Sequence, residues 1–225
     1  MKNQNQQQLT IIAAMVVVAV VAVGIFIFLS RSSAASGSDI DYSSLVQTRT
    51  EDGAFIVGNP DAPITIVEFA DFMCPHCQAY HSTVSRIMEE LVLTGQARFE
   101  YRMLPTQDIS PFVGQVAECA ADQYEGGFFP IHDELFRIGN SSRITNEIGR
   151  RIAEEFDLDY AELLSCTQEA EQVTIDQRLA NRLGVQGTPA IRVRYGDSEA
   201  TAISETYARG SVPYEVIEAA VNNAQ

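Results

Sequence analysis

The chain has 225 residues, a formal net charge of −15 at pH 7 and a single lysine, Lys2, among its 15 cationic side chains. This length fits one domain with a sizeable core rather than two large domains. The arginines form no basic patch or run, so the composition argues against a nucleic-acid partner and indicates a solvated acidic surface.

A polar segment at residues 1–8 precedes a stretch without charged residues at 9–29. As a helix this stretch would rise about 30 Å and cross a bilayer, whereas the apolar core of a cleaved signal peptide is usually roughly 7–15 residues long. We expect a transmembrane anchor or signal segment and favour the uncleaved anchor, although small residues at 32–36 leave cleavage open. Residues 30–53 show no sustained period and are predicted to be a flexible linker.

A β-branched, apolar run at residues 64–69 predicts a buried strand, and a shorter run at residues 55–58 predicts another strand before it. Cys-Pro-His-Cys at residues 74–77 follows the longer run. It opens an amphipathic segment whose apolar side chains recur at helical spacing: Tyr80, Val84, Ile87, Met88 and Leu91. Pro75 suits the first position of this helix, which puts Cys74 at the N-cap.

The start of this helix predicts different roles for the two cysteines. At the N-cap, the sulfur of Cys74 can accept the N–H groups of His76 and Cys77, and a thiolate there meets the positive end of the helix dipole. An imidazolium at His76 would stabilise that thiolate further, which makes the disulfide a better oxidant. We therefore expect Cys74, exposed at the helix tip, to be the attacking thiol, and Cys77 to be the resolving thiol.

A lone C-x-x-C pair is also compatible with a metal site. Cys74, Cys77 and His81 could share one helix face, but the pattern lacks a fourth ligand and no second C-x-x-C completes a tetrahedral zinc site. We interpret His81 and His132 as packing or surface histidines and expect no metal. A redox-inert adaptor is a further alternative, against which both cysteines and His76 argue.

Residues 98–104 alternate like a second sheet strand, so strand, helix and strand form a βαβ unit with a right-handed crossover. Residues 110–183 then break this alternation with five predicted helices. Asp159 and Glu162 have the spacing of a capping box before the fourth of these helices.

The helical block holds the two remaining cysteines, Cys119 and Cys166. A total of four cysteines suits an oxidising compartment, so we expect the domain to lie outside the cytoplasm. There a structural disulfide is favoured over two buried free thiols. It would close a long loop and stabilise the fold by roughly 4 kcal/mol in the chain-entropy model.

Beyond the block, Gly-Thr-Pro at residues 187–189 precedes a predicted strand at residues 190–195. A proline directly before a strand is allowed, and X-Pro bonds are where cis peptides occur, but the sequence does not show the isomer. A final strand near residues 200–204 and a helix from about residue 213 complete the layers of sheet and helix.

Residues 67–77, Val-Glu-Phe-Ala-Asp-Phe-Met-Cys-Pro-His-Cys, resemble the active-site segment of the DsbA-like thiol:disulfide oxidoreductases. The helical block is similar to the domain that these proteins insert into the thioredoxin fold, and residues 119–123 and 131–136 resemble the BdbD-type branch. The resemblance implies an α/β thioredoxin fold, a central mixed sheet flanked by helices, over residues 54–225, with its helical insertion at about residues 110–183.

The resemblance also implies roles for individual residues. Glu68, on the strand beneath the disulfide, would help to move the proton of the resolving thiol. Thr188 and Pro189 would form the cis-proline loop, whose peptide groups hold a substrate strand across Cys74. Reoxidation would require a quinone-carrying membrane partner of the DsbB or vitamin K epoxide reductase type, since this sequence shows no quinone site and no cofactor is expected.

Together these features predict a membrane-tethered, extracytoplasmic dithiol oxidase that acts as a monomer on reduced exported proteins. A substrate thiolate would attack the Cys74–Cys77 disulfide, and a second substrate thiol would resolve the mixed disulfide on Cys74. The alternatives are a disulfide isomerase or reductase of the same fold and, less favoured, a metal-binding protein of that fold. Dimeric isomerases need a dimerisation domain, for which the linker has too few apolar residues.

Overall fold

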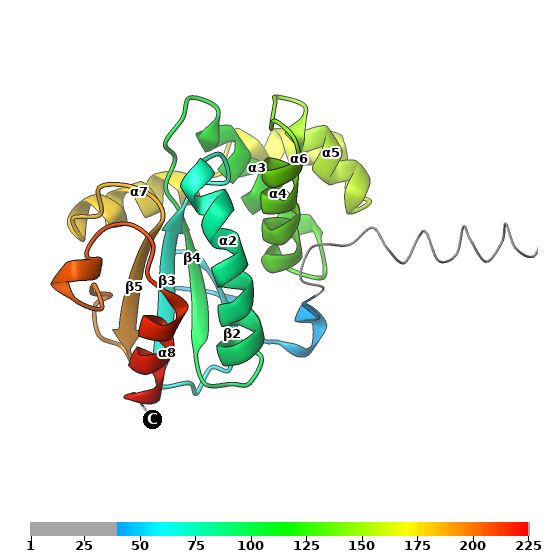
Figure 1. Ribbon diagram of the computed structural model, residues 1–225. Coiled ribbons are helices and arrows are strands. Elements are labelled where there is room, and N and C mark those ends of the chain that lie inside the picture. The colour runs from blue at the N-terminus through cyan, green and yellow to red at the C-terminus, as the bar shows by residue number, and fades with distance from the viewer. Residues whose placement is uncertain (1–39, 225) are drawn as a thin grey trace, which may run out of the picture. The chain divides into compact units, whose positions relative to one another are not determined.

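The computed structural model describes residues 40–224 of the chain (Figure 1). The polar segment expected at residues 1–8, the membrane segment expected at residues 9–29 and the first part of the expected linker lie outside the described residues. Within residues 40–224, no helix has the length and apolar character needed to cross a membrane.

A five-stranded mixed sheet forms the centre of the described part of the chain. Its strands are arranged in the order β1-β2-β4-β3-β5, with bounds β1 Gln47–Arg49, β2 Phe55–Gly58, β3 Ile64–Ala70, β4 Arg98–Met103 and β5 Ala190–Tyr195. β3 runs parallel to β4 and antiparallel to β5. Every residue of β3 is buried, as its near-continuous apolar sequence predicts.

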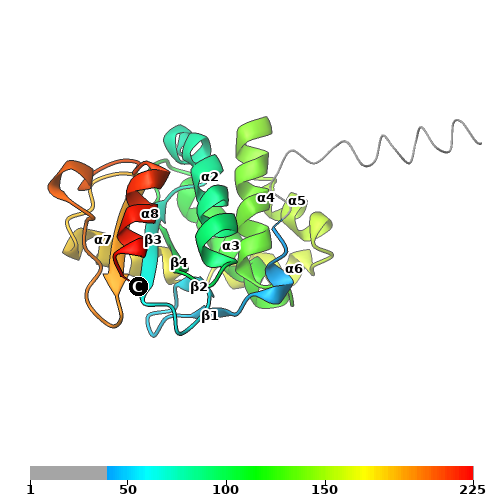
Figure 2. The ribbon, with the colours of Figure 1, turned by 60° about the horizontal axis from the view of Figure 1, so that its bottom comes forward.

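Helices cover both faces of this sheet. α2 (Pro75–Ile87) continues into a π-helical turn at Met88–Val92 and lies beside α8 (Tyr214–Asn222) over one face (Figure 2). α7 (Gln172–Arg182) packs against β4 and the opposite face (Figure 1). The β3-α2-β4 arrangement is the predicted βαβ unit.

The predicted helical block is inserted between β4 and β5. It consists of α7 and of α3 (Ser110–Gln123), α4 (Phe128–Ser141), α5 (Ile148–Glu155) and α6 (Tyr160–Thr167). α3 contacts α4, α5 and α6, and α4 contacts α2, so the block shares its core with the sheet.

The predicted capping box of α6 is half formed. Asp159 Oδ1 accepts the N–H groups of Ala161 and Glu162 at 2.8 and 3.0 Å. The N–H of Asp159, however, donates to Oε1 of Gln123 on α3 at 3.0 Å. A side chain of a neighbouring helix thus takes the place expected for Glu162.

Successive side chains of β3 point to opposite faces of the sheet, so the core has two parts. Ile66 and Ala70 belong to the large cluster that includes Val84 of α2, whereas Val67 and Phe69 pack on the α7 side. A strand buried on both faces delivers the cysteine motif to a fixed position.

Three buried charged side chains on the α7 side of the sheet, Glu100, Arg102 and Asp176, form ion pairs. Arg102 Nε donates to Glu100 Oε1 at 2.6 Å, and Arg102 Nη1 donates to Asp176 Oδ1 at 3.0 Å. Arg194 forms a further ion pair with Glu100. Burial raises the pKa of Asp176 to about 6, although Arg102 opposes this rise. Removing Arg102 would leave Asp176 as a buried carboxylate without a cation, which is strongly destabilising.

The prediction of a flexible linker at residues 30–53 is wrong for residues 40–53, which the structure describes. It contains a 3-10 helix, Tyr42–Ser44, and the strand β1, which pairs with β2. Tyr42 is buried and its hydroxyl donates to Asp133 Oδ2 at 2.7 Å. A three-residue strand is too short to show a period in the sequence, so only its pairing in the fold reveals it.

The final strand expected near residues 200–204 is also corrected. Only Thr201 pairs there, in an isolated bridge with Val193, and a 3-10 helix at Glu205–Tyr207 follows. The helix predicted after residue 213 is α8.

Candidate active site at the start of α2

The cysteine motif lies at the junction of β3 and α2. α2 begins at Pro75 as predicted, and Cys74 occupies its N-cap with an extended backbone. The N–H of Cys74 donates to Asp71 O, and the N–H of Gln78 donates to Cys74 O, both at 3.0 Å. The predicted cap by the sulfur of Cys74 does not form, so backbone bonds hold the start of the helix.

The sulfur of Cys74 faces the loop at Thr188 and Pro189 instead. Its Sγ lies 3.6 Å from the carbonyl oxygen of Thr188. The Thr188–Pro189 peptide bond is cis, as the family resemblance implied. Cys74 is only 7% exposed, so the thiol predicted to be open at the helix tip is largely covered, and Cys77 is 1% exposed. Both thiols are free in this structure.

An open hollow of about 470 Å³ adjoins this loop. It is lined by α2, by the loop and by the segment that leads to α8: His76, Ala79, Tyr80, Thr83, Thr188, Pro189, Gly210 and Ser211. His76 and its neighbour Pro75 are exposed. An extended chain lying in the hollow would pass the Thr188 peptide group that contacts Cys74.

Glu68 lies under the motif in the middle of β3. Its side chain is buried, and its Oε2 has no hydrogen-bond partner among residues 40–224. Burial raises the pKa of Glu68 from 4.5 to about 8, so the carboxyl group holds a proton at neutral pH. The alternative of a solvated carboxylate at a strand edge is therefore wrong.

Burial favours the neutral form of Cys77, as it does that of Glu68. Burial raises the pKa of the Cys77 thiol, and the charge of Glu68 raises it further. Once reduced, Cys77 therefore stays a neutral thiol. The motif thus combines one sulfur beside an open hollow with a second sulfur in the core above an acid.

Comparisons with known proteins agree with this geometry. A family model described as thioredoxin matches residues 50–207. The chain belongs to the thioredoxin family. The probable disulfide bond formation protein D of Bacillus anthracis is 29% identical over 147 residues, which cover 61% of this chain and 68% of that protein.

A second match is of a different kind. The Na(+)/H(+) antiporter NhaA 3 of Salinispora tropica is 32% identical over 140 residues, which cover 60% of this chain. The chain spans only 21% of the length of that antiporter. Among solved structures, oxidised BdbD of Bacillus subtilis aligns with a TM-score of 0.62 at 21% identity, covering 75% of this chain and 91% of that one. The expected DsbA-like thioredoxin fold is thereby confirmed.

In this thioredoxin fold, Asp71 holds the loop before the motif, a role that was not predicted from the sequence. Its Oδ1 accepts the N–H of Met73 at 2.9 Å. Its Oδ2 accepts the N–H of Thr106 and the hydroxyl of Ser110, both at 2.8 Å. An aspartate that bonds the N–H two residues later is a recognisable turn signal, but the contacts across to residues 106–110 exist only in the fold.

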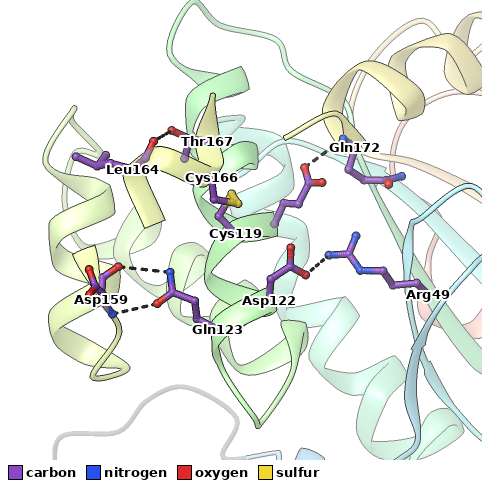
Figure 3. The surroundings of a disulfide bond; sticks show 10 residues. Arg49, Cys119, Asp122, Gln123, Asp159, Leu164, Cys166, Thr167 and Gln172 are labelled. Atoms are coloured by element: carbon purple, nitrogen blue, oxygen red, sulfur yellow. Dashed lines mark hydrogen bonds and ion pairs between the residues drawn. A yellow bond between two sulfur atoms is a disulfide. The ribbon is translucent and has the colours of Figure 1, made fainter. Parts of the chain in front are cut away.

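The predicted second disulfide is present. Cys119 on α3 and Cys166 on α6 are joined, with their Cα atoms 5.8 Å apart (Figure 3). On the neighbouring turns, Gln123 bonds Asp159, and Asp122 of α3 forms an ion pair with Arg49 of β1 at 2.7 Å (Figure 3). The disulfide therefore ties together the helical insertion and lies outside the Cys74–Cys77 site.

His81 does not group with the two cysteines as the metal-site alternative required. It lies with His132 and Asp133, and the three side chains could each offer one ligand atom. His132 Nδ1 lies 2.9 Å from Asp133 Oδ1, and His81 Nε2 lies 3.7 Å from the same oxygen. Burial, with a smaller contribution from His132, lowers the pKa of His81 to about 4. Asp133 contacts His132 of the same helix and also accepts the hydroxyl of Tyr42. We therefore interpret this group as a link between α4 and the N-terminal segment.

Proposed function

We propose that this thioredoxin-family protein is an extracytoplasmic dithiol oxidase that donates a Cys74–Cys77 disulfide to exported proteins. One observation carries the proposal: Cys74 contacts the Thr188 carbonyl beside an open hollow, while Cys77 is buried above Glu68. The names of the Bacillus relatives, disulfide bond formation protein D, support the same chemistry.

Reaction begins at Cys74, the end of the disulfide that contacts the loop lining the hollow. A substrate thiolate attacks Cys74 Sγ, the bond between Cys74 and Cys77 breaks, and its electron pair goes to Cys77 Sγ. Cys77 then takes up a proton, for which the protonated carboxyl of Glu68 is the buried donor. A second substrate thiolate attacks the substrate sulfur of the mixed disulfide and releases Cys74 as a thiolate. The substrate leaves oxidised, and the enzyme is left with two reduced cysteines.

The surroundings of Cys74 suit an extended, unfolded substrate. Backbone groups of Thr188 and Pro189 would pair with the main chain of such a segment, much as a peptide adds to the edge of a sheet. His76, exposed at the hollow, would meet the substrate near the sulfur. Because main-chain groups are the same in every sequence, such binding would accept many different substrates. This fits an enzyme that acts on diverse exported proteins.

The cellular setting follows from the same proposal. Residues 9–29 would anchor a monomer to the membrane with the catalytic domain outside the cytoplasm. A membrane partner of the DsbB or vitamin K epoxide reductase type, carrying a quinone, would reoxidise Cys74 and Cys77.

The reduction potential separates this oxidase from the reductase or isomerase alternative. It is measured by equilibrating the domain with glutathione buffers and counting alkylated Cys74 and Cys77 by mass spectrometry. We expect a value closer to that of DsbA, about −120 mV, than to that of thioredoxin, about −270 mV. A value of about −270 mV would instead assign a reductase. A Cys74→Ser variant reports background reactivity.

A further inference from the structure

A second hollow, of about 180 Å³, lies against the same loop as the first. Its lining consists of residues 186–190, which include the cis-proline loop, and residues 208–210, which precede α8. The two hollows share Thr188, Pro189 and Gly210. Because Cys74 contacts the carbonyl oxygen of Thr188, an extended polypeptide that meets Cys74 beside the first hollow would continue into the second.

The wall of the second hollow is attached to the edge of the sheet. Ala190, the first residue of β5, pairs with Gly210 in an isolated parallel bridge. The buried side chain of Arg192 donates from Nη2 to Ala208 O at 3.0 Å. Arg209 lies between these two attachment points, so its backbone has a defined position in the lining.

Arg209 is the only lysine or arginine in the lining of either hollow. It is exposed, and its side chain forms no hydrogen bond or ion pair with any of residues 40–224. Neither lining contains an aspartate or a glutamate, although the chain has 30 acidic residues and a net charge of −15. The two linings therefore carry no negative charge and present one unpaired cation.

Arg192 places a second positive charge behind this wall. Its guanidinium donates to two carbonyl oxygens, Ile191 O at 2.9 Å and Ala208 O, and no carboxylate among residues 40–224 pairs with it. By contrast, Arg194 on the same strand forms an ion pair with Glu100. Burial lowers the pKa of Arg192, but an arginine still stays protonated at neutral pH. The positive potential at this edge of the sheet favours an anion in the hollow.

We propose that the second hollow binds the carboxylate of an acidic substrate side chain, with Arg209 as its cationic partner. The inference rests on the proposed oxidase function. A guanidinium offers a planar fork of donors that matches both oxygens of a carboxylate. The main-chain contacts at Thr188 would accept many sequences, and this ion pair adds a preference among them. Arg192 is a positioning residue that acts through Ala208.

The preference concerns residues close to the substrate cysteine. The two hollows adjoin, and each residue of an extended chain advances only about 3.3 Å. We therefore expect the oxidase to favour cysteines that have an aspartate or a glutamate within about three residues.

The test compares single-cysteine peptides that differ only by Glu, Gln or Lys at one position near the cysteine. Each peptide reduces the oxidised domain, and alkylation with mass spectrometry follows the loss of the Cys74–Cys77 disulfide. Each rate is divided by the rate of the same peptide with oxidised glutathione, which cancels differences in thiol reactivity. At the best position we expect the Glu peptide to react about fivefold faster than the Gln peptide, through a lower half-saturating concentration. The Lys peptide should be the slowest.

Variants of Arg209 should change this order. In Arg209→Gln the advantage of the Glu peptide should disappear, and in Arg209→Glu the Lys peptide should become the fastest. Arg178→Gln is the matched control, because Arg178 on α7 is also exposed and unpaired among the described residues but lines neither hollow. It should keep the wild-type order. Melting curves verify that each variant is folded.

The outcomes separate this inference from the proposed function. Raising the salt concentration from about 20 to about 500 mM should shrink the preference of the wild type, since salt screens an exposed ion pair. Equal normalised rates of the three peptides with the wild type would overturn the inference while the oxidase stands. An effect of Arg178→Gln as large as that of Arg209→Gln would also overturn it, because a general field would then explain the preference. If no peptide reduces the wild-type domain, the proposed function itself fails.

Discussion

Cys74 and Cys77 are the same side chain in two different environments less than one helical turn apart. Cys74 meets a peptide carbonyl at 3.6 Å beside a hollow, whereas Cys77 is enclosed and its pKa is raised by burial and by Glu68. Reactivity of a thiol follows its accessibility and its thiolate fraction. These two environments support the proposed roles, with the substrate joined to Cys74 and Cys77 as the leaving thiol.

This asymmetry predicts the behaviour of single-cysteine variants. Cys77→Ala incubated with the disulfide-linked dimer of a single-cysteine peptide should accumulate a long-lived mixed disulfide on Cys74, because neither Cys77 nor a second thiol on the attached peptide can release it. Cys77 in the Cys74→Ala variant should react more than about a hundredfold more slowly, since its thiolate fraction is smaller and it is buried. Mass spectrometry of quenched samples measures both rates. Equal reactivity of the two variants would contradict the assignment.

Glu68 makes the stability of the fold depend on pH. Its pKa is about 8 when folded and near 4.5 when unfolded, so the unfolded state loses this proton first as pH rises. The contribution of Glu68 to stability is complete below about pH 4.5 and is lost up to about pH 8. Relative to the wild type, Glu68→Gln should gain about 1.4 kcal/mol per pH unit across this window.

Urea unfolding of the reduced proteins at several pH values measures this difference. Asp176, which also titrates in this range, is unchanged in both proteins and cancels in the comparison. Curves that stay parallel from pH 5 to 8 would show that Glu68 is ionised in the folded protein.

At the scale of elements, the helical insertion is held to the sheet by shared packing and to itself by the Cys119–Cys166 disulfide. That bond joins α3 and α6 across a sequence separation of 47 residues, while α4 packs against α2. Residues of the active site come from β3, α2 and the loop before β5. The disulfide therefore joins two helices of the insertion and lies outside the candidate active site.

Removing this disulfide should separate stability from activity. For a loop of this length, the chain-entropy model predicts that the Cys119→Ala, Cys166→Ala variant loses about 4 kcal/mol, or about 10 °C in melting temperature. Its rate of dithiol oxidation at 25 °C should equal that of the wild type. Calorimetry and a peptide oxidation assay measure the two quantities. A selective loss of activity in a stable variant would instead give the pair a redox role.

At the scale of the whole molecule, the proposed oxidase chemistry would couple the redox state of Cys74 and Cys77 to the stability of the fold. The disulfide of a strong oxidant is one whose reduced form is more stable than its oxidised form. Each 30 mV of potential corresponds to about 1.4 kcal/mol of this difference. Because β3 and α2 lie at the centre of the core, that energy is expressed in global unfolding.

We therefore expect the form reduced at Cys74 and Cys77 to resist denaturant better than the oxidised form. Both forms are compared with the Cys119–Cys166 disulfide intact, which peptide mapping verifies. A more stable oxidised form would favour the reductase alternative over the oxidase.

Local patterns in the sequence by themselves determined the central strand, the start of α2 at Pro75 and the two ends of the helical insertion. These features depend on periodicity and on the chemistry of proline and cysteine, which act between residues close in the chain. The motif also determined the family, because Cys74 to Cys77 and Thr188–Pro189 are short, specific segments.

Only the tertiary structure decided what surrounds these residues. The strand β1, the cover over Cys74, the bonds from Asp71 to Thr106 and Ser110, and the register that places Glu68 beside Tyr101 all join segments far apart in the chain. The raised pKa of Glu68 has the same origin, since burial is a property of the packed sheet and helix and not of any local pattern.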